Sequence, residues 1–192
     1  MKYEDILYEE KNRVATITIN RPKVHNAFRP RTCMELIDAF LKAGWNEEIG
    51  AIVLTGAGNK AFCTGGDQSD HDGAYGGETR GTIGMPVEEL HSAIRDVPKP
   101  VIAKVRGFAI GGGNVLATLC DMTIAGESAI FGQVGPKMGS VDPGFGTAYL
   151  ARVVGEKKAR EIWYMCRRYT AREALAMGLA NAVVADDKLD EE

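Results

Sequence analysis

The chain has 192 residues and a formal net charge of −3, and 45% of its residues are hydrophobic. These values are typical of one soluble globular domain with a substantial core, and we expect residues 1–192 to form a single domain. The small charge predicts no general attraction to nucleic acid or to an anionic membrane, so an anionic ligand must be bound by local groups. No apolar run is long enough to span a bilayer and the first residues do not resemble a signal peptide, which predicts a cytoplasmic protein.

Cysteine and histidine usage predicts neither a disulfide nor a metal centre. The four cysteines are scattered without a CxxC pair, which favours buried free thiols in a reducing compartment. The three histidines are dispersed, so we expect no histidine-based metal site. His91 falls in a predicted amphipathic helix, where we expect it to be structural or exposed.

In the first half of the chain, the pattern predicts two strands and two amphipathic helices. Residues 14–19 alternate in polarity, and Asn20-Arg21-Pro22 ends this strand. Apolar residues recur at helical spacing from Pro30, and a second strand covers residues 51–54. Residues 55–85 are rich in Gly, Asp and Ser and predict a long irregular loop. The helix that follows ends at Pro98. The apolar helix positions are Cys33, Leu36, Ile37, Phe40 and Leu41 in the first helix, and Val87, Leu90, Ile94 and Val97 in the second.

The second half predicts shorter elements in a repeating order. A strand at residues 101–105 leads into a triple glycine and a helix through Leu119, and short strands follow at 122–125 and 129–131. A second irregular segment, 132–146, precedes helices at about 147–154, 156–166 and 171–177. The recurring strand–strand–helix order predicts an α/β domain of repeated units. The acidic residues 186–192 are consistent either with the start of a further helix or with a charged, frayed tail.

Two glycine-rich turns after predicted strands carry the strongest chemical signal. They are Thr64-Gly65-Gly66-Asp67-Gln68 and Ile110-Gly111-Gly112-Gly113-Asn114. Glycine lets a backbone approach a ligand closely, and the second turn opens a helix whose free N–H groups favour negative charge. Tight packing between strand and helix explains either turn alone. Together they can direct two N–H groups at one oxygen, which is the geometry of an oxyanion hole.

With Asn20-Arg21-Pro22, Asn26-Ala27 and Cys120-Asp121, these turns resemble the crotonase (enoyl-CoA hydratase/isomerase) superfamily over essentially the whole chain. The resemblance implies a ClpP-like spiral of ββα units, assembly into homotrimers or hexamers, and an acyl-CoA thioester substrate. Coenzyme A then enters as part of the substrate, and no cofactor is bound permanently. The two oxyanion-hole N–H groups fall on Gly66 and Gly112. Members usually carry further C-terminal helices, which we expect this chain to lack.

The positions at which this sequence departs from the superfamily pattern reduce the number of reactions that we expect it to catalyse. Hydratases use two glutamates, and the matching positions here are Val115 and Gly135. Neither side chain can transfer a proton, so simple hydration of an enoyl thioester is not expected. The segment 131–144 is instead similar to a subgroup containing 2-ketocyclohexanecarboxyl-CoA hydrolase and 1,4-dihydroxy-2-naphthoyl-CoA synthase. The catalytic Ser and Asp of that subgroup correspond to Ser140 and Asp142, for which a purely structural role in a turn is the alternative.

The resemblance also assigns residues to the ligand. The synthase commonly binds bicarbonate as its base through a Thr hydroxyl, and Val134 stands at that position. Gln133, the Gly135 N–H and Trp163 still suit an anion or an ordered water, so bicarbonate is possible but not favoured. Further residues implied are Val24, His25 and Ala27 along the CoA nucleotide, Thr64, Gly65, Asp67 and Gln68 at the thioester end, and Tyr75 near the acyl ring.

The leading hypothesis is hydrolytic ring opening of 2-oxocyclohexane-1-carboxyl-CoA to pimeloyl-CoA, a retro-Dieckmann cleavage. The thioester enolate would be stabilised by Gly66 and Gly112, and Asp142, oriented with Ser140, would activate water or move the proton. The second hypothesis is the intramolecular Claisen condensation of the naphthoyl-CoA synthase. The third is a non-catalytic member that binds acyl-CoA without turnover.

Overall fold

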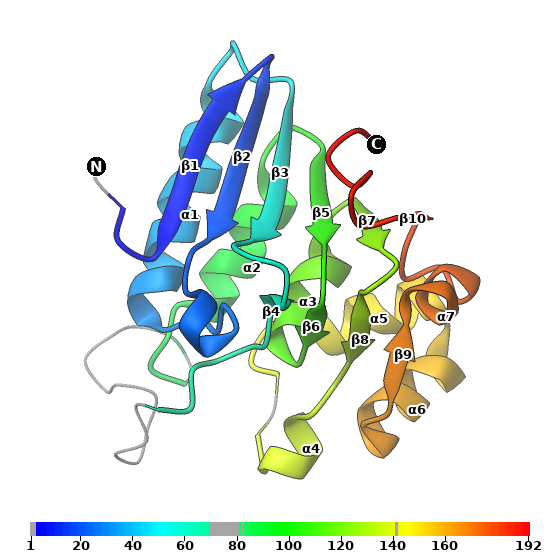
Figure 1. Cartoon of the computed structure of the whole chain (residues 1–192). Coiled ribbons are helices and arrows are strands. Elements are labelled where there is room, and N and C mark those ends of the chain that lie inside the picture. Colours follow the sequence, from blue (N-terminus) through cyan, green and yellow to red (C-terminus); the bar gives the residue numbers. More distant parts are fainter. Residues whose placement is uncertain (1–2, 70–80, 82, 141) are drawn as a thin grey trace.

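The computed structural model describes residues 3–69, 81, 83–140 and 142–192. Within these residues the strands form a six-stranded sheet in the order β1-β2-β3-β5-β7-β10 and a four-stranded sheet in the order β4-β6-β8-β9 (Figure 1). The strands are β1 (Ile6–Lys11), β2 (Val14–Ile19), β3 (Ala51–Gly56), β4 (Ala61–Cys63), β5 (Val101–Val105), β6 (Phe108–Ile110), β7 (Met122–Gly126), β8 (Ile130–Gly132), β9 (Arg168–Thr170) and β10 (Ala182–Val184). The helices are the 3₁₀ turn η1 (Pro22–Val24), α1 (Pro30–Trp45), α2 (Val87–Asp96), α3 (Gly112–Leu119), α4 (Gly135–Met138), α5 (Gly146–Val154), α6 (Glu156–Met165) and α7 (Ala171–Ala176).

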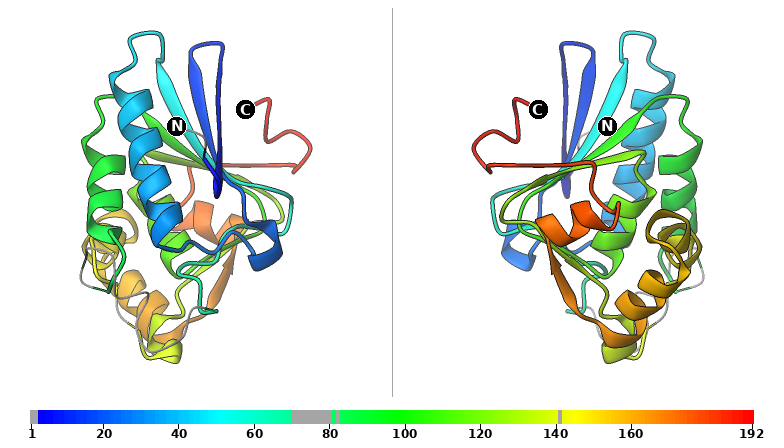
Figure 2. Two further views of the ribbon diagram at one scale, coloured as in Figure 1. Left: turned by 90° about the vertical axis from the view of Figure 1, so that its left-hand side faces the viewer. Right: turned by 90° about the vertical axis from the view of Figure 1, so that its right-hand side faces the viewer.

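The large sheet is built around buried alternating strands. In β2 the side chains of Ala15, Ile17 and Ile19 are fully buried, as the alternation of this segment predicts. The strands β2, β3, β5, β7 and β10 run parallel, and β1 pairs antiparallel with β2 at the edge. Helix α1 packs on β1, β2 and β3 and beside α2, and Figure 2 shows both helices on the same side of the sheet. Leu36 and Phe40 of α1 are fully buried in this layer.

The chain repeats a unit of two strands and a helix, as the superfamily resemblance implies. The units are β3-β4-α2, β5-β6-α3 and β7-β8-α4. In each, the first strand joins the large sheet and the second joins the small sheet. The three second strands, β4, β6 and β8, run parallel to one another. Their carboxyl ends therefore meet at one edge of the small sheet, where ligands bind in open α/β sheets.

Several sequence-based expectations for the elements are wrong. Residues 55–85 are not irregular throughout, because β3 extends to Gly56 and β4 follows it. The two glycine turns directly follow β4 and β6, three-residue strands of the small sheet that the pattern missed. The segment 132–146 contains the short helix α4. β1 was also missed, because most of its side chains face solvent and give no apolar alternation.

Residues 186–191 are held against the domain and do not form a frayed tail. Residues 186–191 form consecutive turns, closed by hydrogen bonds from Lys188 N to Ala185 O (2.9 Å) and from Glu191 N to Lys188 O (3.0 Å). Leu189 is buried in the core, and the Asp186 carboxylate accepts from Ser128 N at 3.2 Å. Burial of Leu189 and the contact of Asp186 with Ser128 anchor this segment to the domain.

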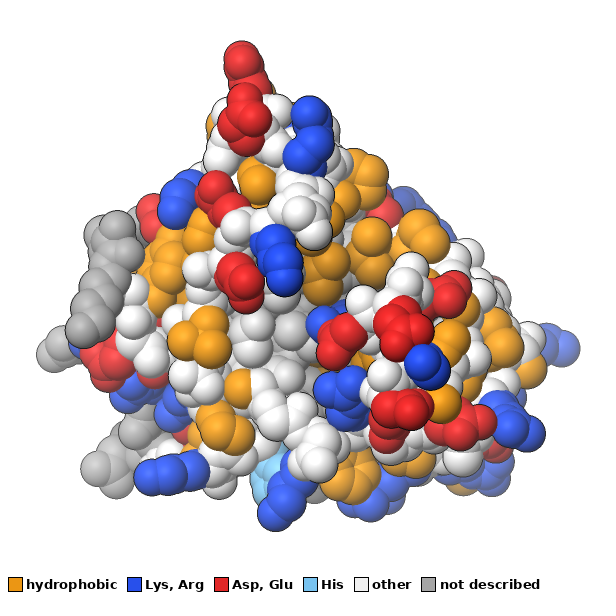
Figure 3. Space-filling view, turned by 45° about the horizontal axis from the view of Figure 1, so that its top comes forward, with side chains coloured by type: hydrophobic (Ala, Val, Ile, Leu, Met, Phe, Trp, Pro, Cys, Tyr) orange, Lys and Arg blue, Asp and Glu red, His pale blue; other side chains and the backbone are white. Residues whose placement is uncertain are grey.

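The surface carries charges of both signs. On the face shown in Figure 3, acidic and basic side chains are interspersed, and neither sign forms a continuous area. This agrees with the small net charge of the chain. In the described ranges, none of the helices is both long enough and apolar enough to cross a bilayer.

Candidate active site

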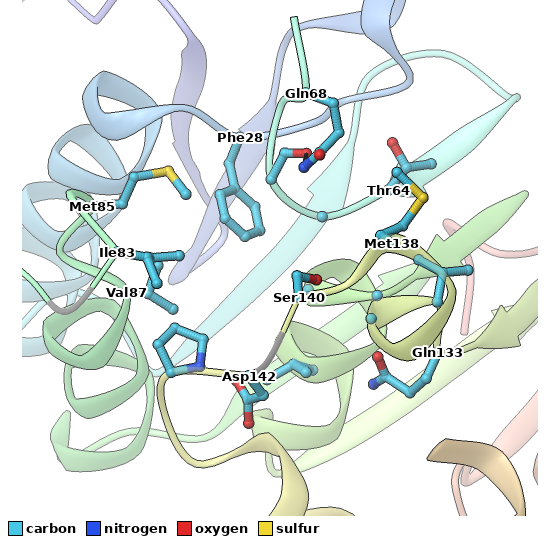
Figure 4. Close-up of a pocket in the computed structure, with 18 of the residues that line it drawn as sticks. Phe28, Thr64, Gln68, Ile83, Met85, Val87, Gln133, Met138, Ser140 and Asp142 are labelled. Atoms are coloured by element: carbon cyan, nitrogen blue, oxygen red, sulfur yellow. Dashed lines mark hydrogen bonds between the residues drawn. The ribbon is translucent and has the colours of Figure 1, made fainter. Parts of the chain in front are cut away.

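A cavity of about 260 Å³ opens at the carboxyl ends of β4, β6 and β8. Each of these strands is followed at once by a segment that lines the cavity: Thr64 to Gly66, then Gly111 and Gly112, then Gln133 to Gly135. Phe28, the region of α2 and the segment around Ser140 complete the wall, and Figure 4 shows their side chains around the open space. The small sheet thus brings together three loops that are far apart in the sequence.

The first glycine turn is held by backbone pairing with Phe28. Phe28 N donates to Gly65 O and Asp67 N donates to Phe28 O, both at 2.8 Å, in a parallel bridge opposite Gly66. Because successive peptide groups alternate in direction along an extended segment, the N–H of Gly66 points away from Phe28. Among the described residues this N–H has no acceptor, and Gly66 lines the cavity.

The second glycine turn supplies a matching donor. Gly111 N continues the small sheet by donating to Gly132 O at 2.9 Å, and α3 begins at the next residue. The Gly112 N–H is therefore one of the first-turn groups without an intrahelical acceptor, and no other described residue accepts from it. The positive end of the helix dipole reinforces this N–H as a partner for negative charge.

The two turns approach each other so closely that both need glycine. A β-carbon added to Gly65, where φ is +90°, would lie 2.9 Å from Gly112 N. One added to Gly112 would lie 2.7 Å from the Phe28 ring and 3.2 Å from the Gly65 Cα. The two N–H groups of Gly66 and Gly112 therefore border the same small volume, as an oxyanion hole requires.

The carboxylate of Asp142 is fixed by backbone donors at the opposite wall. Its Oδ1 accepts from Gly144 N at 3.3 Å, and its Oδ2 accepts from Thr147 N at 3.1 Å in the first turn of α5. A β-carbon added to Gly146 would lie 2.7 Å from Asp142 Oδ2 and 2.6 Å from a methyl group of Val115. Asp142 therefore occupies the space beside Val115, and it is the only carboxylate among the described residues of the cavity wall.

Ser140 lies at the same end of the cavity. Its N–H donates to Gly135 O at 3.0 Å, at the end of α4. A β-carbon added to Gly135 would lie 3.6 Å from Ser140 Oγ and 3.5 Å from the ring of Trp163. The nearest atom to that β-carbon would be Ser140 O at 3.0 Å, so Gly135 is packed closely between Ser140 and Trp163 and leaves no room for a larger side chain. The indole Nε1 of Trp163 is buried without a partner among the described residues.

His91 is a cavity residue whose place in the site the sequence pattern did not reveal. It is 1% exposed, it lines the cavity, and its Nδ1 accepts from Phe145 N at 3.2 Å. Burial lowers the pKa of His91 to about 4, although the nearby charges of Asp142 and Glu88 act in the opposite direction. Its partner Phe145 is distant in the sequence, so no local signal connected His91 to this wall.

The structure gathers most of the predicted site residues but not all of them. Asp67 faces away from the cavity: its Oδ2 pairs with Arg21 Nη1 at 2.7 Å, and its Oδ1 accepts from Ser69 Oγ at 2.6 Å. Tyr75 lies outside the described residues. Those gathered at the cavity are Thr64, Gly65, Gly66, Gln68, Gly112, Gln133, Gly135, Ser140, Asp142 and Trp163.

The residues expected along the nucleotide lie beside a different hollow. His25 lines a cavity of about 300 Å³ together with Pro22, Lys23 and Lys60. The Thr64 hydroxyl donates to His25 O at 3.3 Å, which connects this segment with the first glycine turn. Val24 and Ala27 flank His25, half-buried and buried respectively, and line neither hollow.

Cys63 precedes the first glycine turn and is not available as a nucleophile. Its side chain is fully buried, and burial raises the pKa of its thiol to about 12. The thiol accepts a hydrogen bond from Gly65 N at 3.4 Å. Its role is therefore to pack beneath the turn.

Comparison with known families agrees with the geometry of the glycine turns. Residues 9–192 match the family model for enoyl-CoA hydratase/isomerase. The chain therefore belongs to the enoyl-CoA hydratase/isomerase family, the crotonase superfamily, whose members process acyl-CoA thioesters on this fold.

Solved structures of similar proteins support this assignment. An enoyl-CoA hydratase/isomerase from Xanthobacter autotrophicus Py2 is 34% identical with a TM-score of 0.88, and the match covers 99% of this chain and 70% of that one. An enoyl-CoA hydratase/carnithine racemase from Magnetospirillum magneticum is 32% identical with a TM-score of 0.90, over 99% and 72%. An enoyl-CoA hydratase from Bacillus anthracis is 30% identical with a TM-score of 0.85, over 98% and 73%.

Proposed function

We propose that this protein hydrolyses a ring carbon–carbon bond of 2-oxocyclohexane-1-carboxyl-CoA and releases pimeloyl-CoA. The observation that carries the proposal is the composition of the cavity wall. Val115 and Gly135 stand where the family resemblance puts the hydratase glutamates, and Asp142 is the only carboxylate among the described lining residues. A single carboxylate beside the proposed oxyanion hole suits a reaction in which one group takes a proton from water and later returns it to carbon.

In the proposed reaction, the thioester oxygen accepts hydrogen bonds from the N–H groups of Gly66 and Gly112. Water adds to the ring ketone while Asp142 takes its proton. The bond between the ketone carbon and the α-carbon then breaks, and its electron pair forms the thioester enolate, whose charge the two N–H groups stabilise. Asp142 returns the proton to the α-carbon. The products are a carboxylic acid at one end of the chain and the intact thioester at the other.

Two features of the wall support this assignment of roles. Asp142 accepts two backbone hydrogen bonds, which fix its orientation. Gly135 is packed closely between Ser140 and Trp163, so this part of the wall has no room for an acidic side chain. In this proposal the Ser140 hydroxyl, which lines the cavity, orients the attacking water. No bicarbonate is needed in this scheme, because Asp142 supplies the base.

The test is incubation of the protein with 2-oxocyclohexane-1-carboxyl-CoA and, separately, with o-succinylbenzoyl-CoA, with products identified by mass. Pimeloyl-CoA supports the proposal. A naphthoyl-CoA product alone would overturn it in favour of the condensing enzyme, and CoA binding without either product would favour a non-catalytic role.

Asp142→Asn separates catalysis from binding. We expect a loss of about 10²–10⁴-fold in turnover, because general acid–base groups typically contribute that much, with thioester affinity retained. Asp187→Asn is the matched control, since Asp187 is exposed and lies outside the cavity. Full activity of Asp142→Asn would remove this carboxylate from the mechanism.

A further inference from the structure

His91 is a buried imidazole on the cavity wall to which the proposed mechanism gives no task. It lies in α2 and is 1% exposed, which is unusual for a titratable side chain without a salt bridge. Its ring contacts that of Phe145 with a centroid distance of 5.9 Å. It also fills the space above Gly144, where an added β-carbon would lie 2.1 Å from Nδ1. The ring is therefore held in one position.

The hydrogen bond to Nδ1 fixes which ring nitrogen carries the proton. Phe145 N is a donor, so Nδ1 must be the bare nitrogen that accepts from it at 3.2 Å. In the neutral ring the proton is then on Nε2. Within the described part of the chain Nε2 has no hydrogen-bond partner, so it is the polar atom that this ring can offer to the cavity.

The charged groups around His91 do not keep its ring protonated. The negative charges that act on it are Asp142 from the loop before α5 and Glu88 from the preceding turn of α2. Burial outweighs both, and the ring is neutral near pH 7. A neutral imidazole with Nδ1 occupied cannot accept a proton at the cavity. It can only donate a hydrogen bond there.

We propose that the neutral imidazole of His91 donates a hydrogen bond from Nε2 to the ring ketone oxygen of the bound acyl-CoA. This inference rests on the proposed function for the identity of that ketone. His91 lines the same cavity as the two glycine turns, and it lies beside the segment of Asp142, since Phe145 N donates to its ring and the Asp142 charge acts on it. The site thereby has separate donors for the two carbonyl oxygens of a β-keto thioester.

The proposed contact also assists the chemical step. When water oxygen bonds to the ketone carbon, the carbonyl π pair moves onto the ketone oxygen, and the Nε2–H group stabilises the alkoxide that forms. The water proton goes to Asp142. When the alkoxide re-forms a carbonyl, the ring bond breaks and its electron pair enters the thioester enolate. His91 keeps its own proton throughout.

Two substitutions separate the two nitrogens of His91. His91→Asn keeps an acceptor near the place of Nδ1 and removes the group at Nε2, whereas His91→Gln keeps a donor near Nε2 and loses the anchor to Phe145. The measured quantity is the ratio of dissociation constants for 2-oxocyclohexane-1-carboxyl-CoA and cyclohexane-1-carboxyl-CoA, which lacks the ketone. Asp142→Asn serves as the background so that turnover does not interfere.

With His91 present we expect the ketone ligand to bind about tenfold more tightly than the ligand without it, the effect of one hydrogen bond. The preference should disappear in His91→Asn and survive in His91→Gln. An unchanged preference in a folded Asn variant would overturn the inference and leave His91 as a support for the Asp142 loop. Whether pimeloyl-CoA forms in the unsubstituted protein tests the proposed function separately, since the preference is read without turnover.

Nitrogen NMR of the unsubstituted protein tests the inference without any variant. The chain has three histidines, so isotopic labelling of histidine gives few signals. We expect the Nε2–H tautomer for His91 and a shift of its Nε2 resonance with the ketone ligand but not with the cyclohexane ligand. The Nδ1–H tautomer, or an equal response to both ligands, would overturn the inference.

Discussion

Replacing Gly65 by alanine is the sharpest test of the oxyanion hole, because Gly65 itself donates nothing to the ligand. The added β-carbon would lie 2.9 Å from Gly112 N, 3.5 Å from Ile110 O and 3.6 Å from Gly112 Cα. All three atoms belong to the backbone, which cannot rotate away as a side chain would. The two turns must therefore separate, and the N–H groups of Gly66 and Gly112 no longer converge on one oxygen.

The magnitude has two parts that can be measured independently. A non-glycine residue at the φ of +90° of Gly65 costs about 1–3 kcal/mol of folding stability through backbone strain. Loss of one oxyanion donor costs about 10²–10³-fold in turnover, or about 3–4 kcal/mol in the transition state. Gly155→Ala is the matched control, since Gly155 has φ of +81° but no atom within 4 Å of an added β-carbon. It should show the strain alone.

The assay combines urea unfolding, turnover and the infrared stretch of the thioester carbonyl in bound cyclohexane-1-carboxyl-CoA. Both variants should be destabilised, and Gly65→Ala at least as much as Gly155→Ala, because it adds close backbone contacts to the same strain. Only Gly65→Ala should lose turnover and the shift of the carbonyl stretch to lower frequency. If Gly65→Ala keeps both, the two N–H groups do not form the thioester site, and the reasoning from the close approach of the turns is refuted.

Two further predictions concern stability. Burial lowers the pKa of His91 from 6.5 to about 4, so the unfolded chain takes up the proton first as the pH falls. The contribution of the neutral ring to folding stability is therefore complete above pH 6.5. It declines by about 3 kcal/mol towards pH 4. Urea unfolding of His91→Gln should lack this decline, and equal pH dependence would contradict the assignment. Asp67→Asn should cost about 2–3 kcal/mol, because it leaves the Arg21 guanidinium half-buried beside Asp5 alone. Glu156→Gln, at an exposed pair with Arg160, is the control and should change little in thermal unfolding.

The ion pair of Asp67 also explains why its predicted place at the thioester end differs from its place in the structure. Burial alone would raise the pKa of Asp67, but hydrogen bonds from Ser69 and the Arg21 guanidinium hold it below its usual range. The carboxylate therefore supports the turn from behind. Its neighbour in sequence, Gly66, faces the cavity because side chains and peptide groups alternate along the segment.

The glycine turns that line the cavity could be recognised in the sequence, because the close approach of their backbones requires glycine at specific points. Their role as an oxyanion hole stays a prediction. Gly65 and Gly112 lie so close together that a side chain on either would clash with the other turn, and this requirement is visible in the sequence as glycine. Helix α1 and the strand β2 were equally predictable, since their apolar residues follow a local period.

The rest depended on contacts that no local pattern encodes. β4 and β6 have three residues each, too few to show a period, and they form by pairing with each other. His91 is held at the cavity wall by a hydrogen bond from Phe145 N, which is distant in the sequence. The turns at the end of the chain form around Leu189, whose burial depends on its place against the large sheet rather than on its neighbours in sequence.

The contact of Asp142 and Val115 at Gly146 has a consequence for how one scaffold accommodates different chemistries. Both side chains come within 3 Å of a single point, where Gly146 has only a hydrogen. A glutamate at position 115 would therefore press a second negative charge against Asp142, and each carboxylate would resist ionisation of the other. An acidic side chain on helix α3 and one on the loop before α5 would therefore compete for the same volume. Under the proposed function, exchanging one for the other would move the proton donor along the substrate, while the thioester would still be bound by the main-chain N–H groups of Gly66 and Gly112.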